Sequence, residues 1–206
     1  ICLVLGSDEE RKQYADFFER PLPSEHLSKL NSQCREYERK ISAIGKRLHY
    51  VYQKEKRGFG HAVYQASGFA GAEPVLLLLG DTIYKSNTNK PCALQLIEEY
   101  EKYNNLIVSI HDVPLVDVSR YGILTGVWED KKDKVLNVSM MTEKPKASYA
   151  EEHLGVVDSD NEKKYFSVFG QYILTPEVFE QLASDIATAD SENSTREIEL
   201  TSALEA

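Results

Sequence analysis

The sequence predicts an α/β fold in which helices flank a mainly parallel sheet. Short aliphatic runs alternate with amphipathic stretches along most of the chain, which is the pattern of βαβ units. The run at 74–79 is aliphatic after its first residue, as expected of a strand that helices cover on both faces. The 206 residues are 42% hydrophobic, enough for a packed core. We therefore expect a single domain over residues 1–206.

The first elements follow from hydrophobic periodicity. Residues 1–5 form an apolar run that should lie in a buried strand, and Gly6–Asp8 supplies a turn with a cap for the next helix. From Leu27 to Ile44, apolar residues recur at steps of three and four, which places them on one face of a helix. This spacing predicts one continuous helix that ends near Gly45.

The next elements alternate regularly between strand and helix. A strand should occupy 48–52, and a helix opened by Gly58–Gly60 should bury Ala62, Val63, Ala66 and Phe69. The aliphatic strand at 74–79 ends at Gly80–Asp81. A helix over 92–103, with Leu94, Ile97 and Tyr100 inward, and a strand over 106–110 follow.

The second half of the chain is richer in strands. Strands are expected at 121–127, 135–140 and 165–174. A helix should begin at Pro176, because a proline in the first turn lacks only an N–H that would be unpaired anyway. Residues 185–195 read as a mobile loop, and the segment from 197 is helix-like again.

Charge and composition exclude several classes of function. The formal net charge of −9 argues against nucleic-acid binding, and the longest aliphatic run, Val75–Leu79, is too short to cross a membrane. Three dispersed cysteines and five unclustered histidines predict neither disulfides nor a zinc site, and they fit a cytoplasmic protein with reduced thiols. The chain opens on a strand-like run and closes in a helix-like one, so we expect it to be part of a longer protein.

Asp81 is the first candidate for chemistry. It follows an aliphatic strand and a glycine, and ligands in open α/β sheets bind beyond the carboxyl ends of the strands. A carboxylate at this place is suited to Mg²⁺. The alternative is that Asp81 only caps its own loop through its side chain.

The glycine-containing loop at 54–60 is the second candidate. Gly58 and Gly60 stand where a strand leads into a helix, so backbone N–H groups could face a phosphate or a flat base. Lys54, Lys56 and Arg57 add positive charge in an acidic chain. A tight turn with a solvated charged rim explains the same residues equally well, and His61 beside it reads as a hydrogen-bonding residue at the helix start.

The third candidate lies at the end of a later strand. Glu143 could accept hydrogen bonds from sugar hydroxyls, and Lys144 could offer its ammonium to a phosphate. Pro145 should hold Lys144 extended. Gly122 begins another strand and would let a ligand approach the backbone. A surface turn and an ordinary strand glycine are the alternatives.

These strings together resemble a known family. The segments, in order, are YVYQKEKRGFGHAVYQA (50–66), VLLLLGDTIY (75–84), VSRYGIL (118–124), TEKPK (142–146), GQYILTPEVFEQL (170–182) and EIELTSAL (197–204). They are similar to the corresponding segments of bacterial UTP–glucose-1-phosphate uridylyltransferases. The resemblance covers nearly the whole chain. It implies a Rossmann-like nucleotidyltransferase fold, with a mixed, mostly parallel sheet flanked by helices, and the formation of UDP-glucose and pyrophosphate with Mg²⁺.

The resemblance also assigns roles to single residues. Residues 1–110 would form a nucleotide-binding half, in which Gln53 reads the uracil edge and Gly58 and Gly60 approach the base. Residues 111–206 would form a sugar-binding half. Its assigned residues are Gly122, Glu143, Lys144 and Gly170, with Lys144 near the sugar phosphate. Asp81 would hold the metal, and Asp81 and Lys144 would be the catalytic residues.

Departures from the family pattern leave other readings open. The family's N-terminal glycine-rich loop and its second metal-binding aspartate have no counterpart here, and Ser202 stands where the family usually has aspartate. The alternatives are a thymidylyltransferase, an enzyme for another sugar phosphate, and a non-catalytic homologue that binds a nucleotide sugar. The expected substrates are a nucleoside triphosphate and a sugar 1-phosphate. We expect a homo-oligomer with no nucleic-acid or membrane partner.

Overall fold

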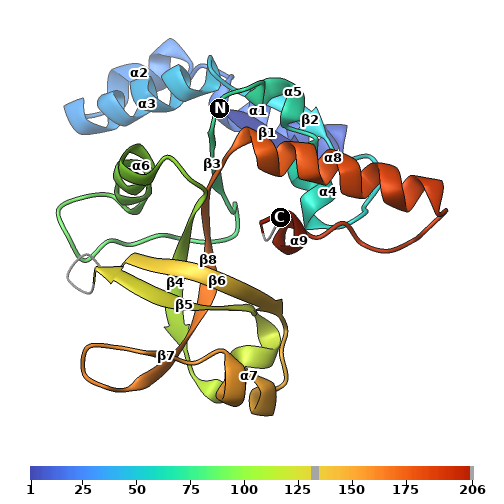
Figure 1. The fold of residues 1–206 in the computed structure, drawn as a ribbon. Coiled ribbons are helices and arrows are strands. Elements are labelled where there is room, and N and C mark those ends of the chain that lie inside the picture. The colour runs from blue at the N-terminus through green and yellow to red at the C-terminus, as the bar shows by residue number, and fades with distance from the viewer. Residues whose placement is uncertain (131–134, 205–206) are drawn as a thin grey trace. The chain divides into compact units, whose positions relative to one another are not determined.

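The structure, a computed structural model, describes residues 1–130 and 135–204 (Figure 1). The chain divides into two compact units. The first unit comprises Ile1–Gly71 and Leu182–Leu200, and the second comprises Ala72–Gln181 and Thr201–Ala206. The expected functional halves, 1–110 and 111–206, remain predictions, because these units are defined by backbone contacts and not by bound ligands.

The first unit is built around a pair of parallel strands. Strand β1 (Cys2–Leu5) pairs with β2 (His49–Tyr52), and the register runs from Cys2 opposite His49 to Leu5 opposite Tyr52. The helices of this unit are α1 (Asp8–Phe18), α2 (Ser24–Lys29), α3 (Ser32–Gly45), α4 (Phe59–Tyr64) and α5 (Ser67–Ala70). Ser7 caps α1 by accepting a hydrogen bond from the backbone N–H of Glu10.

Several expectations for the first unit are wrong. Only Leu5 is buried in the first strand, while Ile1 is 50% exposed. The single helix expected to end near Gly45 is two helices, because Leu30 is extended and the Asn31 side chain caps α3 at the N–H of Cys34. Phe69, expected to face inward, is exposed, since a break between α4 and α5 turns it outward.

The second unit contains a six-stranded sheet centred on the long strand β8 (Lys163–Leu174). The main path runs β3 (Val75–Leu78), β8, β5 (Gly122–Asp130) and β6 (Val135–Glu143), while β4 (Ile107–Val113) and β7 (Val156–Val157) also pair with β8. The helical segments that belong to this unit wholly or in part are α6 (Cys92–Tyr103), η1 (Leu115–Arg120), α7 (Ala147–His153), α8 (Pro176–Ser191) and α9 (Leu200–Leu204). Residues Leu182–Leu200, which include the later part of α8, are assigned to the first unit.

The pairing in this sheet corrects one expectation. Within the described residues, every strand pair of the second unit is antiparallel, and the β1–β2 pair of the first unit is parallel. The mostly parallel sheet expected from βαβ alternation is therefore not what these strand pairs show. The α/β character itself is confirmed, and so are the strands expected at 121–127, 135–140 and 165–174, which correspond to β5, β6 and β8.

Two predicted helices begin where the sequence places them, but two expectations about this part of the chain are wrong: Leu94 does not face inward, and 185–195 is not a loop throughout. The helix expected over 92–103 is α6, with Leu96 as its buried residue and Leu94 exposed, and the helix expected at Pro176 begins there. The expectation of a mobile loop at 185–195 is wrong, because α8 continues to Ser191. Alanines favour that continuation, and Ala189 is 1% exposed.

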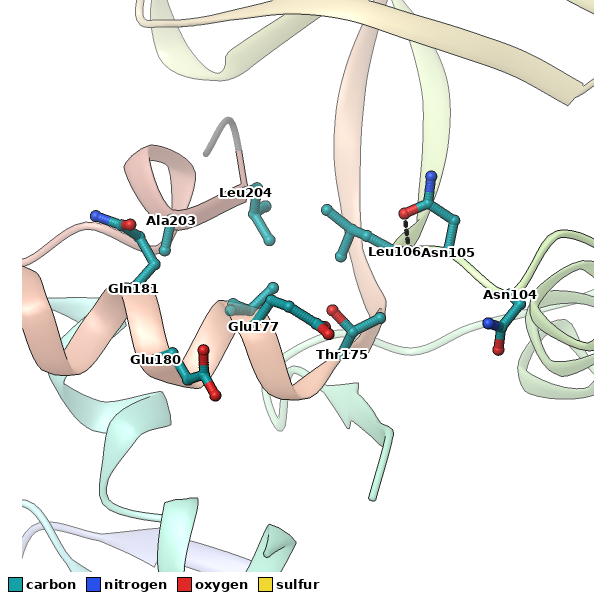
Figure 2. Close-up of a pocket in the computed structure, with 10 residues that line it drawn as sticks. Asn104, Asn105, Leu106, Thr175, Glu177, Glu180, Gln181, Ala203 and Leu204 are labelled. Atoms are coloured by element: carbon teal, nitrogen blue, oxygen red, sulfur yellow. Dashed lines mark hydrogen bonds between the residues drawn. The ribbon is translucent and has the colours of Figure 1, made fainter. Parts of the chain in front are cut away.

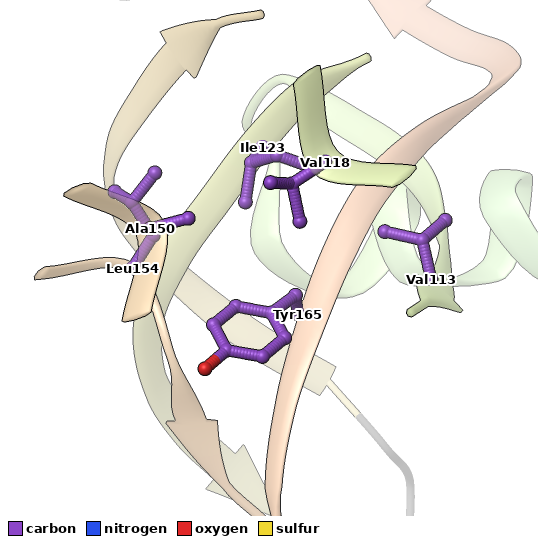
Figure 3. Packing of buried hydrophobic residues seen from close by; sticks show 6 residues of the cluster. All are labelled: Val113, Val118, Ile123, Ala150, Leu154 and Tyr165. Atoms are coloured by element: carbon purple, nitrogen blue, oxygen red, sulfur yellow. The ribbon is translucent and has the colours of Figure 1, made fainter. Parts of the chain in front are cut away.

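A small hydrophobic cluster packs against the six-stranded sheet of the second unit. Val113, Val118, Ile123, Ala150, Leu154 and Tyr165 pack against one another (Figure 3). These residues come from β4, β5 and β8, from η1, from α7 and from the residue that directly follows α7. Each fully buried aliphatic side chain contributes about 1.5–3 kcal/mol of transfer free energy, so this cluster fixes the strand ends that carry Gly122.

The described residues can be searched for disulfides, for metal-binding clusters and for membrane-spanning helices. Cys2, Cys34 and Cys92 are all free thiols in this structure. Among residues 1–130 and 135–204, no group of three or more His, Cys, Asp or Glu side chains is arranged to hold a metal. In the same part of the chain, no helix has the length and apolar character needed to cross a bilayer.

Candidate functional site

The glycine-containing loop of the first unit packs closely against a later part of the chain. The N–H of Gly60 donates to the carbonyl oxygen of Ile198 at 2.8 Å, and the N–H of Ile198 donates to the carbonyl of Arg57 at 2.8 Å. Gly58 has φ = 100°, and a Cβ there would lie 2.6 Å from the Ile198 carbonyl oxygen. Both glycines therefore have a structural reason to be present, whatever else they bind.

Gln53 is tied directly to this loop. Its side-chain amide donates to the carbonyl of Gly58 at 2.9 Å and lies 3.1 Å from Nδ1 of His61. Burial, followed by the nearby Arg57 charge, lowers the pKa of His61 and favours a neutral ring that can accept this hydrogen bond. The structure thus brings Gln53, Gly58 and Gly60 together, although one edge of the Gln53 amide is already bonded within the protein.

The positive charges of the loop are not equivalent. Lys54 and Lys56 are exposed. Arg57 is partly buried and forms an ion pair with Asp190 of α8 at 2.7 Å. The alternative of a solvated charged rim therefore applies to the two lysines, while Arg57 joins the end of α8 to the loop.

Asp81 lies at the end of a strand, as the sequence indicated. It is exposed in the turn after β3, and its carboxylate accepts a hydrogen bond from the hydroxyl of Thr82 at 3.2 Å. Within the described residues, this carboxylate makes no hydrogen bond or ion pair with any other predicted site residue. Asp81 is therefore accessible to a ligand.

Gly170 lies at the base of the loop that carries Asp81. Its carbonyl accepts hydrogen bonds from the N–H of Leu79 at 3.1 Å and from the hydroxyl of Tyr84 at 2.6 Å. The register between β4 and β8 shifts around Gly170, whose φ of 64° marks a bulge. A Cβ at Gly170 would lie 2.8 Å from the Tyr84 hydroxyl, so a glycine is required for this close packing.

The sugar-site residues form a second cluster in the same unit. Gly122 and Glu143 are paired in the register of β5 and β6, and a Cβ at Gly122 would lie 2.9 Å from Oε2 of Glu143. Nζ of Lys144 lies 3.4 Å from Oε1 of Glu143, and the hydroxyl of Thr201 donates to Oε2 at 3.4 Å. Three of the predicted residues are therefore adjacent, because antiparallel pairing joins the start of one strand to the end of the next.

The backbone of Lys144 corrects an expectation. Pro145 was expected to hold Lys144 extended, but Lys144 has φ = 45°, in the left-handed region. Its N–H donates to the carbonyl of Tyr121 at 3.0 Å, which fixes this geometry. A non-glycine residue in the left-handed region costs about 1–3 kcal/mol and such residues cluster at functional sites.

Tyr172 is a buried residue that interacts electrostatically both with Tyr84, near the Asp81 loop, and with Glu143 of the sugar-site cluster. Burial, together with the smaller effects of the neighbouring Tyr84 and of the Glu143 carboxylate, raises the pKa of Tyr172 to about 12. Glu143 and the tyrosine that closes the Asp81 loop therefore both lie within electrostatic range of one buried phenol.

Sequence reasoning missed several polar residues around these clusters. Tyr84 and Ser109 bond to the bulge at Gly170, Thr201 bonds to Glu143, and the buried Gln171 has an Oε1 atom without a hydrogen-bond partner among the described residues. No local motif singles them out. The polar Gln171 within an otherwise hydrophobic strand was the one available signal.

A cavity of about 570 Å³ lies elsewhere in the second unit (Figure 2). Its lining includes Asn104 and Leu106 before β4 and Thr175, Glu177 and Glu180 at the start of α8. It contains none of the eight predicted site residues. The two carboxylates on its lining repel phosphates, so the cavity is unsuited to the expected anionic substrates.

The donor chemistry of the second unit fits a magnesium ion in part. Asp81 offers one accessible carboxylate, with the Thr82 hydroxyl beside it. Mg²⁺ is commonly held by one or two carboxylates together with substrate phosphates and water, and it needs no cage made by protein alone. The absence of a three-residue metal cluster among the described residues is compatible with that mode.

Comparisons with known proteins agree with the resemblance seen in the sequence. The model of the family described as nucleotidyl transferase matches residues 25–206. UTP–glucose-1-phosphate uridylyltransferases of Staphylococcus epidermidis and Staphylococcus haemolyticus are each 35% identical to the chain over 158 residues. The aligned region is 77% of this chain and 48% of each relative, so the chain spans about half the length of these curated relatives.

Solved structures give the same answer for the fold. A UDP-glucose pyrophosphorylase complexed with UDP-glucose is 28% identical, with a TM-score of 0.70 over 99% of this chain and 67% of that chain. An apo UDP-glucose pyrophosphorylase is 29% identical, with a TM-score of 0.73 over the same shares. The nucleotidyltransferase fold expected from the sequence is confirmed, and the chain belongs to the nucleotidyl transferase family.

Proposed function

We propose that the protein containing this chain transfers a uridylyl group from UTP to glucose 1-phosphate and releases pyrophosphate. The observation that carries the proposal is the cluster of Gly122, Glu143 and Lys144. It places a carboxylate, an ammonium and an open backbone position side by side on a fold whose relatives are named for this reaction.

Glu143 and Gly122 would bind the sugar. A carboxylate accepts hydrogen bonds from vicinal hydroxyls, and the glycine allows a pyranose ring to approach the backbone of β5. The hydroxyl of Thr201 and the ammonium of Lys144 hold the two carboxylate oxygens of Glu143 from different directions. This arrangement places the carboxylate beside Gly122, where a sugar ring would bind.

Lys144 and Asp81 would manage charge during transfer. In the reaction, a phosphate oxygen of glucose 1-phosphate attacks the α-phosphorus of UTP, a new P–O bond forms, and the bond to pyrophosphate breaks. Two unit charges of like sign repel by about 4 kcal/mol at 4 Å and an effective dielectric of 20. The Lys144 ammonium, 62% exposed on its side chain, is free to turn from Glu143 toward a sugar phosphate and offset that repulsion.

Asp81 would hold a divalent cation, for which we propose Mg²⁺. When bound, such an ion supplies positive charge that neutralises phosphate oxygens. The contribution of the chain is an exposed carboxylate on a loop whose base is closed by hydrogen bonds. No general base is needed, because the attacking phosphate oxygen is already anionic.

In the first unit, Gln53, Gly58 and Gly60 would bind the nucleotide. The free part of the Gln53 amide could read a base edge, and the glycines leave space on the exposed side of the loop. We also propose a cytoplasmic, homo-oligomeric enzyme that acts on small molecules. The three free thiols and the net charge of −9 support a reducing compartment and the lack of a nucleic-acid partner.

A pyrophosphate-release assay on the full natural polypeptide tests this function. Each of UTP and dTTP is paired with glucose 1-phosphate and with a second hexose 1-phosphate. The proposal predicts the highest kcat/KM for UTP with glucose 1-phosphate, and a requirement for Mg²⁺. Preference for dTTP or another sugar phosphate would support the alternative specificities. Binding of UDP-glucose without any turnover would support a non-catalytic homologue.

A further inference from the structure

The loop that carries Asp81 is closed by Tyr84, the last residue of the segment 75–84, to which no role was assigned from the sequence. The Tyr84 hydroxyl donates to the carbonyl of Gly170 at 2.6 Å and accepts a hydrogen bond from the N–H of Leu79 at 3.2 Å. The Leu79 N–H also donates to the Gly170 carbonyl at 3.1 Å. The residues on either side of the loop, 79 and 84, therefore share one anchor on β8.

That anchor is itself held in place. The Ser109 hydroxyl lies 2.9 Å from the carbonyl oxygen of Phe169 and accepts a hydrogen bond from the N–H of Gln171 at 3.2 Å. These bonds satisfy backbone groups that the bulge around Gly170 leaves without strand partners. Gly170 is buried, so the loop is tied to a fixed point in the central strand of the sheet.

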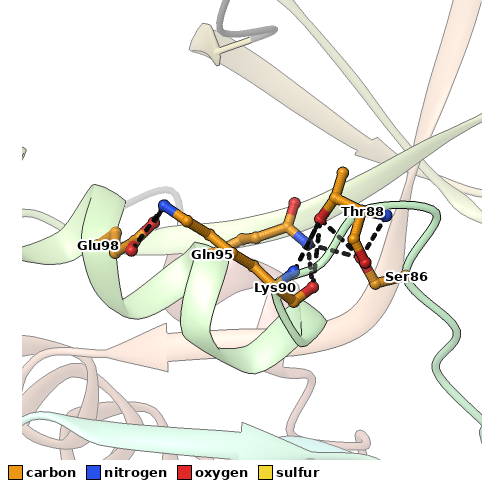
Figure 4. Close-up of polar contacts among 5 residues, drawn as sticks. All are labelled: Ser86, Thr88, Lys90, Gln95 and Glu98. Carbon is orange, nitrogen blue, oxygen red and sulfur yellow. Dashed lines mark hydrogen bonds and ion pairs between the residues drawn. The ribbon is translucent and has the colours of Figure 1, made fainter.

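The segment after Tyr84 is anchored independently (Figure 4). The Gln95 amide of α6 donates to the Ser86 hydroxyl at 3.1 Å and to the carbonyl of Lys90 at 3.0 Å. The Lys90 ammonium pairs with Glu98 at 2.7 Å. The chain is thus held by hydrogen bonds before residue 80 and after residue 85. Between these points, the hydrogen bonds of Tyr84 limit how far the backbone of residues 80–83 can move.

The conformation of residues 80–83 depends on the hydrogen bonds of the Tyr84 hydroxyl. Asp81 is exposed and bonds to Thr82, and the Ile83 side chain is 93% exposed. A short loop without buried side chains gains little order from packing, so hydrogen bonds at its ends determine its conformation.

We propose that Tyr84 is a positioning residue, whose hydroxyl orients Asp81 for a divalent cation by locking the 80–83 loop to Gly170. This inference rests on the proposed function of Asp81. Tyr84→Phe removes one oxygen and retains the ring that lies edge-on to Phe169 at 5.7 Å. Its effect should therefore fall on the loop and leave the packing of the sheet in place.

The experiment measures binding of Mn²⁺ to the full natural polypeptide by electron paramagnetic resonance, with UDP-glucose saturating. We expect Asp81→Asn to abolish the Mn²⁺ site and Tyr84→Phe to raise its dissociation constant about tenfold, as for the loss of one well-placed hydrogen bond. In turnover assays, Tyr84→Phe should raise the Mg²⁺ concentration for half-maximal rate and leave the KM for glucose 1-phosphate unchanged.

Two matched variants separate positioning from general destabilisation. Ser109→Ala removes a hydroxyl from the same bulge but keeps both bonds from the loop to Gly170, so it should lower the melting temperature and weaken Mn²⁺ binding clearly less than Tyr84→Phe does. Tyr149→Phe makes the same chemical change at an exposed ring on α7, against His153. It should leave Mn²⁺ affinity, turnover and melting temperature unchanged.

The outcomes distinguish this inference from the proposed function. Wild-type Mn²⁺ affinity in Tyr84→Phe, with the site lost in Asp81→Asn, would overturn the role of Tyr84 and leave the function standing. An equal loss of affinity in Ser109→Ala and Tyr84→Phe would also overturn it, as would a Tyr84→Phe protein that is unfolded at 10 °C. No Mn²⁺ binding to wild type, or unchanged binding in Asp81→Asn, would instead reject the proposed metal role.

Discussion

The glycines of the two proposed binding clusters, Gly58 and Gly60 in the first unit and Gly122 in the second, differ in what lies beside them. In the first unit, Gly58 and Gly60 lie against the backbone of Ile198 and Glu199, so the space that a side chain would fill is taken by fixed atoms. In the second unit, Gly122 lies against the flexible end of the Glu143 side chain. The first arrangement is needed for folding, whereas the second leaves room that a substrate can use. A glycine in a motif is therefore informative only when its neighbour is known.

The largest effect is expected on turnover, from the carboxylate of the second unit. Asp81→Asn removes the charge and keeps the size, so activity should fall by about 100-fold or more, as when one transition-state stabilising group is lost. The melting temperature should not change, because Asp81 is exposed. Glu73→Gln, at another exposed carboxylate of the same unit, is the control for net charge. Activity within threefold of wild type in Asp81→Asn would contradict the metal role.

The next effect concerns stability in the first unit. A Cβ at Gly60 would lie 2.8 Å from the backbone carbon of Glu199 and 2.8 Å from Cδ2 of Leu182. Gly60→Ala should therefore lower the free energy of unfolding by about 1–3 kcal/mol, as overpacking does in other cores. Urea denaturation measures this change. Gly68→Ala is the matched control, since a Cβ at that position meets open space, and equal stability of the two variants would refute the close packing.

A smaller and different effect is expected from Gly122→Ala. The new methyl group meets only the end of the Glu143 side chain, at 2.9 Å, and that side chain can move. The free energy of unfolding should change by less than about 1 kcal/mol, while the KM for glucose 1-phosphate rises about tenfold and that for UTP does not. A stability loss as large as that of Gly60→Ala would remove the distinction between Gly60 and Gly122.

The smallest effect is a dependence of stability on pH. Burial lowers the pKa of His111 below its usual 6.5, against an opposing effect of Asp112. The folded state therefore favours the neutral ring, and the unfolded chain takes up the proton first as the pH falls. Stability should decline below about pH 6.5, and His111→Gln should show a shallower decline than His26→Gln at an exposed position on α2. Identical slopes in urea titrations from pH 7 to 5 would contradict this.

Much of the fold could be predicted because its signals are local. The helix over 92–103 and the strands β5, β6 and β8 follow from periodicity over a few residues. The break at Leu30 and Asn31 could not, since the hydrophobic spacing continues across it while the Asn31 cap competes locally. Antiparallel pairing in the second unit depends on contacts between distant segments, which periodicity does not describe.

The candidate site shows the same limit. Glu143, Lys144 and Gly122 were singled out one by one, but their proximity depends on the register between β5 and β6. The segment that fills the space beside Gly58 comes from Ile198, 140 positions later in the chain. Tyr84 was missed because its role rests on the carbonyl of Gly170, and a hydrogen bond to a distant backbone atom leaves no local motif.

The most direct test of the account is a titration of the full, ¹⁵N-labelled polypeptide with UDP-glucose, followed through backbone amide signals. We predict that the amides of Gly122 and Lys144 shift and saturate with UDP-glucose, and that Gly122→Ala weakens this binding while the amide of Gly68 does not shift. Asp81→Asn should bind UDP-glucose with unchanged affinity when no metal is present. Saturable binding that leaves the amides of Gly122 and Lys144 unshifted would contradict the proposed sugar site.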